Sequence, residues 1–125
     1  MTMKAILTDD APLPVGPYSQ AIISNDTVIV SGQIPLDPKT GIIPDCISEQ
    51  ATLVFSNLMS ILNAAGVMKG RIMQVTVYLT NMDDFNVVND IYKRFFSEPF
   101  PARTCIGVSA LPKGSKIMAD ALGGL

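Results

Sequence analysis

The chain has 125 residues, of which 48% are hydrophobic and only 16% are charged, against roughly a quarter charged in an average globular protein. Nine Lys and Arg residues against eleven Asp and Glu residues leave a net charge of −2, so the sequence lacks the basic surface that binds nucleic acid or an anionic membrane. The sequence contains no histidine, which excludes the commonest general base and every catalytic triad built on imidazole.

The length predicts one domain over residues 1–125. A domain of this size buries only part of its surface, and with so few charges some of the remaining apolar surface is expected to be covered by another copy of the chain. Cys46 and Cys105 lie far apart and form no zinc-binding spacing, so no metal site is expected. We also expect a cytoplasmic protein with reduced thiols, because the sequence shows neither a secretory leader nor an apolar run long enough to span a bilayer.

Three strands are expected in the first part of the chain. Residues 5–8 are apolar enough for a short strand, and three prolines within 11–17 exclude both a helix and a central strand there. Residues 18–23 and 27–33 are typical of strands, and the Asn25-Asp26 turn between them predicts a hairpin.

Two helices follow from the spacing of apolar residues. From 47 to 65 these residues recur at intervals of three and four, with Asp45 as the expected N-cap and Gly66 as the residue that ends the helix. The second helix begins at 85, carries aromatic residues on one face, and must end before Pro99.

Three further strands are expected at 72–80, 102–110 and 116–122, the last after a turn at 112–114. The resulting order is βββαβαββ. This order predicts an α+β domain with a mixed sheet and both helices on one face.

Polar residues at the ends of these strands are the first candidates for a site. The stretches 16–20 and 31–35 combine restricted backbone with hydroxyl and amide groups, which suits either turns or ligand contacts. Arg103 opens an otherwise apolar strand, and its guanidinium requires a carboxylate, from a ligand or from an Asp or Glu elsewhere in the fold. Cys105 lies on the same side of that strand as Arg103. Two interpretations of it are open, a nucleophile or a small buried side chain.

The sequence resembles the Rid family (reactive intermediate deaminase A, also called YjgF and, in older naming, liver perchloric-acid-soluble protein or endoribonuclease L-PSP). The resemblance covers essentially the whole chain. It rests on GPYSQ at 16–20, VSGQIP at 30–35, Gly41, AAG at 64–66, VTVYL at 75–79, the helix residues Asp84-Phe85, Val88-Asn89, Tyr92 and Phe95-Phe96, and FPARTC at 100–105.

The resemblance implies a chorismate-mutase-like α+β fold and a homotrimer with clefts between neighbouring subunits. It also implies hydrolysis of small 2-imino acids and their enamine tautomers to 2-keto acids and ammonia, without a cofactor or a metal. The family's carboxylate clamp falls on Arg103. The residues that would assist it in binding the substrate are Tyr18, Ser31, Gly32, Asn89 and Cys105.

The last strand departs from the family pattern. Members usually carry two glutamates there, and the first, which orients the attacking water, falls on Met118, whereas the second falls on Asp120. A thioether cannot act as a base. Asp120 is therefore the remaining candidate catalytic carboxylate beside Arg103, and a bulge after Gly114 would alter its register.

Three functions remain open from the sequence. An imine deaminase is the preferred interpretation, because a clamp and an oriented water suffice for so easy a hydrolysis. A trimeric module that binds small carboxylates for sensing or regulation would keep the cleft without turnover. A ribonuclease or translation inhibitor is the least favoured, because the chain has no histidine and a net negative charge.

Overall fold

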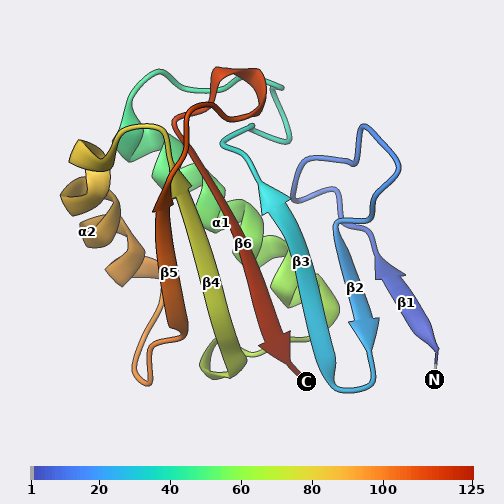
Figure 1. Ribbon diagram of the computed structural model, residues 1–125. Helices are drawn as coiled ribbons and strands as arrows, with labels where there is room; N and C mark the ends of the chain where they lie inside the picture. The colour runs from blue at the N-terminus through green and yellow to red at the C-terminus, as the bar shows by residue number, and fades with distance from the viewer. Residues whose placement is uncertain (1) are drawn as a thin grey trace.

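Six strands form one mixed sheet in the structure, a computed structural model that describes residues 2–125 (Figure 1). The strands are β1 (Met3–Ile6), β2 (Ala21–Ser24), β3 (Thr27–Gln33), β4 (Ile72–Leu79), β5 (Ala102–Gly107) and β6 (Ile117–Gly124). Their order in the sheet is β1-β2-β3-β6-β4-β5, with β4 and β5 parallel and every other pair antiparallel. The expected βββαβαββ order and the mixed α+β fold are confirmed.

Two helices, α1 (Ile47–Ala65) and α2 (Phe85–Phe95), pack on one face of this sheet, and three short 3₁₀ turns lie at Lys69–Arg71, Met82–Asp84 and Pro112–Gly114. In Figure 1, α1 runs behind the sheet and α2 lies beside β5. Because side chains alternate along a strand, β4 and β6 bury every second residue beneath the helices. We call the opposite side of the sheet, which neither α1 nor α2 covers, the open face.

The N-cap of α1 is Cys46, so the expectation of Asp45 was wrong by one residue. Cys46 has the extended backbone of an N-cap, and its carbonyl accepts the N–H of Gln50. Its side chain makes no capping hydrogen bond. Gly66 ends the helix as expected, with a left-handed φ of 86° that glycine adopts without strain.

The expected strand at 102–110 ends earlier, at Gly107, and the last strand is shifted to Ile117–Gly124. The first two strands differ from the expected bounds because Gln20 holds a loop in place. β1 ends at Ile6, since the N–H of Thr8 donates to Gln20 Oε1 (2.7 Å) rather than to a neighbouring strand. The Gln20 amide, which is 1% exposed, donates to the carbonyl of Pro12 at 2.8 Å. β2 begins only at Ala21, because Tyr18 donates its N–H to the carbonyl of Gly16 in a tight turn.

A β-bulge in β3 is the irregularity that bears on function. Val30 pairs with Ala121 and Gln33 pairs with Ala119, so Ser31 and Gly32 lie together opposite the one residue between them, Asp120. β6 itself alternates regularly over its first residues, which keeps Met118 and Asp120 on the open face. The bulge therefore lies in β3 and not after Gly114, where the sequence had allowed one.

No helix within residues 2–125 is long and apolar enough to cross a membrane.

Candidate functional site

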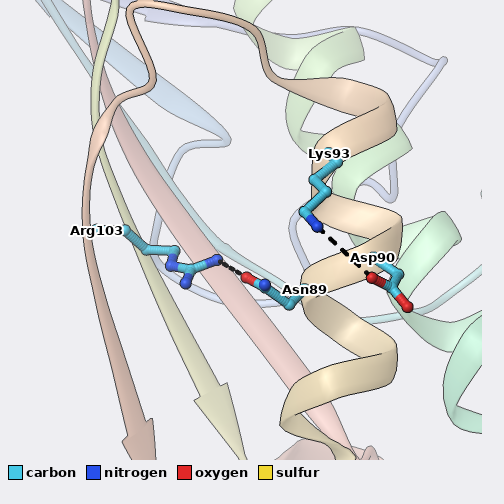
Figure 2. A network of polar contacts seen from close by, with 4 residues as sticks. All are labelled: Asn89, Asp90, Lys93 and Arg103. Carbon is cyan, nitrogen blue, oxygen red and sulfur yellow. Dashed lines mark hydrogen bonds and ion pairs between the residues drawn. The ribbon is translucent and has the colours of Figure 1, made fainter.

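Arg103 extends from β5 toward α2, where its guanidinium is held from two sides. Its Nη1 donates to Asn89 Oδ1 at 2.8 Å (Figure 2). Its Cζ lies 4.7 Å from the ring centroid of Tyr92 and 5.5 Å from that of Phe85, both within the range of cation–π attraction. These contacts fix the plane of the guanidinium without neutralising its charge.

Among residues 2–125, no carboxylate forms an ion pair with Arg103. The nearby acid, Asp90, pairs instead with Lys93 one helical turn along, at 3.8 Å, and points away from Arg103 (Figure 2). The structural salt bridge that the sequence had left open is therefore absent from the described chain. Nε and Nη2 of Arg103 also have no acceptor within this part of the protein, so they are available to a ligand.

The surface beside Arg103 is hollowed into a cavity of about 370 Å³ lined by Asn89, Tyr92, Lys93, Phe100, Pro101 and Arg103. Its walls are aromatic and apolar except for the amide of Asn89 and the two cations. Such a cavity suits a small anion with an apolar part. A larger groove of about 690 Å³ lies between α1 and α2 and contains none of the expected site residues.

Cys105 and Tyr92 flank the guanidinium and remain protonated. Burial raises the pKa of the Cys105 thiol, and the Arg103 charge offsets part of that rise. Burial likewise raises the pKa of Tyr92, again opposed by Arg103. The Tyr92 hydroxyl is buried and has no hydrogen-bond partner among the described residues. Cys105 is thus not an activated nucleophile.

Three other expected residues gather at the bulge of β3. The hydroxyl of Ser31 donates to the carbonyl of Ser19 at 2.6 Å, and its N–H donates to the carbonyl of Gln20 at 2.9 Å. These bonds hold the loop that carries Tyr18, which is half exposed, against the bulge that carries Gly32.

The last strand completes this second group. Met118 lies across Gly32, since a Cβ placed on Gly32 would be 3.0 Å from the Met118 sulfur. Asp120 Oδ2 accepts a hydrogen bond from the hydroxyl of Tyr78 at 3.0 Å. Position 118 therefore presents an apolar side chain to the bulge. The carboxylate of Asp120 lies two residues further along the strand, on the same face.

The structure thus groups the expected residues into two clusters. The arginine cluster consists of Arg103, Asn89 and Cys105 together with Tyr92, and the bulge cluster consists of Tyr18, Ser31, Gly32, Met118 and Asp120. The first lies on the helix side of the sheet and the second on or beside the open face, so one chain does not bring Arg103 and Asp120 together. No group of three His, Cys, Asp or Glu side chains within residues 2–125 is placed to hold a metal ion.

Two tyrosines that contact the clusters, Tyr92 and Tyr78, were not predicted as site residues from the sequence. Tyr92 is expected as a core residue of the second helix, yet it also supports the guanidinium, and its position three residues after Asn89 could have shown this. Tyr78 is expected only as part of a strand. Its pairing with β6 is non-local, and no sequence signal points to it.

Comparisons with known proteins identify the family of the chain. Residues 8–122 match the family model described as Endoribonuclease L-PSP. The chain is 43% identical over 122 residues to the 2-iminobutanoate/2-iminopropanoate deaminase of Salmonella typhimurium, covering 95% of each protein. The crystal structure of E. coli TdcF with bound serine matches with a TM-score of 0.94 and 40% identity over 98% of each chain. RidA from Psychrobacter sp. matches with a TM-score of 0.94 and 38% identity over 98% of this chain and 99% of that one.

Proposed function

The chain belongs to the endoribonuclease L-PSP family, also called the Rid or YjgF family, and on that premise we propose that it hydrolyses small 2-imino acids such as 2-iminobutanoate to 2-keto acids and ammonia. The observation that carries the proposal is Arg103, a rigidly held guanidinium with unused donors beside a small cavity. Nε and Nη2 lie on adjacent corners of the guanidinium and match the two oxygens of a carboxylate.

The reaction suits a site of this kind because the imine carbon is already electrophilic. Water adds to that carbon: a base takes one water proton as the C–O bond forms, and the imine nitrogen gains a proton as C=N becomes a single bond. In the resulting carbinolamine, the nitrogen takes up the proton lost by the hydroxyl as the C–N bond breaks, which releases ammonia and leaves the 2-keto acid. Holding the substrate carboxylate and orienting the water supply most of what such a step needs.

We place the substrate between two copies of the chain in a homotrimer. The arginine cluster and the bulge cluster lie on different sides of one sheet, so a neighbouring subunit would have to bring the second to the first. The open face supports this arrangement, because it exposes the large apolar side chains of Ile29 and Ile106.

A second function is favoured by one residue. Met118 stands where the water-orienting glutamate is expected, and a thioether is too weak an acceptor to replace it. A chain that kept the arginine cluster but lost turnover would be a trimeric carboxylate-binding module. The tests must therefore measure binding and turnover separately.

The deciding experiment generates 2-iminobutanoate with a threonine dehydratase and follows its disappearance and the release of ammonia. We expect the wild type to exceed the protein-free blank. Met118→Glu should raise kcat by up to about 10²-fold, because a positioned acid–base group is worth roughly 10²–10⁴ in rate. Met118→Gln is the matched control, because glutamine has the shape of glutamate without its charge. Its kcat should stay near that of the wild type.

Binding of 2-oxobutanoate, followed by thermal protection, separates the two functions. If the wild type equals the blank while Met118→Glu is active and both bind the keto acid, the native chain is a binding module and not a deaminase. Native mass spectrometry of the same samples gives the number of subunits.

A further inference from the structure

Asp120 occupies a distinctive place in the sheet. It faces Thr76 of β4 on one side, and on the other side it faces the two residues of the β3 bulge, Ser31 and Gly32. The bulge places two residues of β3 opposite Asp120. The backbone of Asp120 therefore lies beside two of the residues expected to contact the substrate.

Tyr78 fixes the direction in which this carboxylate points. Tyr78 is paired with Met118, one step along the face from Asp120, and its ring reaches diagonally so that the hydroxyl donates to Asp120 Oδ2 at 3.0 Å. The other oxygen, Oδ1, has no hydrogen-bond partner among residues 2–125. One oxygen is thus held by the protein and the other is open to water.

The hydroxyl of Tyr78 remains a donor at neutral pH. Burial, the hydrogen bond to Asp120 and the Asp120 charge all raise its pKa. The hydrogen bond is therefore a phenol donating to a carboxylate, which is stronger and more directional than a bond between two neutral groups.

Met118 leaves this carboxylate as the acid–base group nearest the bulge. The Met118 side chain lies against Gly32 and offers no oxygen to a water molecule. Within the bulge cluster as defined above, Asp120 carries the only carboxyl group.

We propose that Tyr78 is a positioning residue that holds Asp120 as the water-orienting carboxylate of the cleft, in place of the glutamate absent at position 118. This inference rests on the proposed deaminase function. Oδ1 of Asp120 accepts one proton of the attacking water as the C–O bond forms and passes it to the nitrogen of the carbinolamine. It then accepts the hydroxyl proton and delivers it to the same nitrogen as the C–N bond breaks, so that both water protons leave with ammonia. Tyr78 transfers no proton and acts only through the hydrogen bond to Oδ2.

The test compares Tyr78→Phe with the wild type in the imine-decay assay and measures kcat and KM separately. Losing one hydrogen bond to a charged group should lower kcat about tenfold, while KM and 2-oxobutanoate affinity stay unchanged because Arg103 still binds the carboxylate. Thr76→Val is the matched control, since it removes a hydroxyl from the strand position facing Asp120 without removing a hydrogen bond to that residue. It should keep the wild-type kcat. Thermal unfolding and native mass verify folding and assembly.

Asp120→Asn supplies the second part of the test. It should lower kcat by about 10²-fold or more, and adding Tyr78→Phe to it should have no further effect, because two residues that act through one group are not additive. An unchanged kcat in Tyr78→Phe, or a fully additive double variant, would overturn the positioning role while leaving the deaminase function standing. A wild type no faster than the blank would overturn the deaminase function and this role with it.

Discussion

The arginine cluster and the bulge cluster differ in how closely they follow the family pattern. In the arginine cluster every residue that the resemblance implies is present, and the guanidinium is supported by an amide and two rings. In the bulge cluster the backbone and Ser31 are in place, but Met118 replaces the expected glutamate. Under the proposed deaminase function, substrate recognition and water activation depend on separate parts of this fold, so one can change while the other is retained.

The largest effect is expected from Arg103→Ala, which removes the guanidinium that is proposed to bind the substrate carboxylate. Two hydrogen bonds to a carboxylate are worth about 10²–10⁴-fold in affinity, so both 2-oxobutanoate binding and kcat/KM should fall by that factor. Isothermal titration of the keto acid measures the binding directly. Because Arg103 is exposed, the melting temperature should stay within a few degrees of the wild type, roughly the range of most surface substitutions. Retained binding in this variant would show that the clamp lies elsewhere.

A smaller effect is expected from Asn89→Asp, which keeps the side chain's shape and adds a charge beside Arg103. The new carboxylate would pair with the guanidinium and compete with the substrate, so KM should rise about tenfold with little change in kcat, as for one hydrogen bond to a charged group. The control is Asp90→Asn at the next residue, which alters charge only at the Lys93 pair and should leave KM unchanged. Equal KM values for the two variants would contradict the role of Asn89.

The smallest effect is expected from Gly32→Ala, which tests the packing of the bulge cluster. The added methyl would lie 3.0 Å from the Met118 sulfur and 3.3 Å from its terminal carbon, so the flexible methionine must move. We expect a loss of about 1 kcal/mol in unfolding free energy, as for mild overpacking. In a Met118→Ala background the same substitution should cost less, and thermal melts of the four proteins measure the coupling. Additive effects would show that the two side chains do not share this space.

The sequence predicted the fold well where the determinants are local. The helix over 47–65 and its end at Gly66 follow from spacing and from one glycine, and both are confirmed. The first strands were misplaced because Gln20, a single buried amide, ties the Pro-rich loop through contacts up to twelve residues away. No pattern of hydrophobic residues reports such a contact.

The sequence predicted most residues of the candidate site, and it did not predict how they are arranged in space. Arg103 and Cys105 share a side because strands alternate, which is a local rule. The placement of Asp120 opposite Ser31 and Gly32, and the hydrogen bond from Tyr78, depend on pairings between distant strands and on a bulge in one of them. The roles of these residues in catalysis stay predictions.

The positions of β5 and β6 in the sheet imply that the two clusters differ in local stability. β5, which carries Arg103, is an edge strand with a neighbour on one side only, whereas β6, which carries Asp120, lies between β3 and β4. Edge strands open before central ones, because fewer hydrogen bonds must break. In an isolated chain, local opening would therefore displace the arginine long before the aspartate, and the strand that is proposed to bind the substrate would gain most from a neighbour's protection.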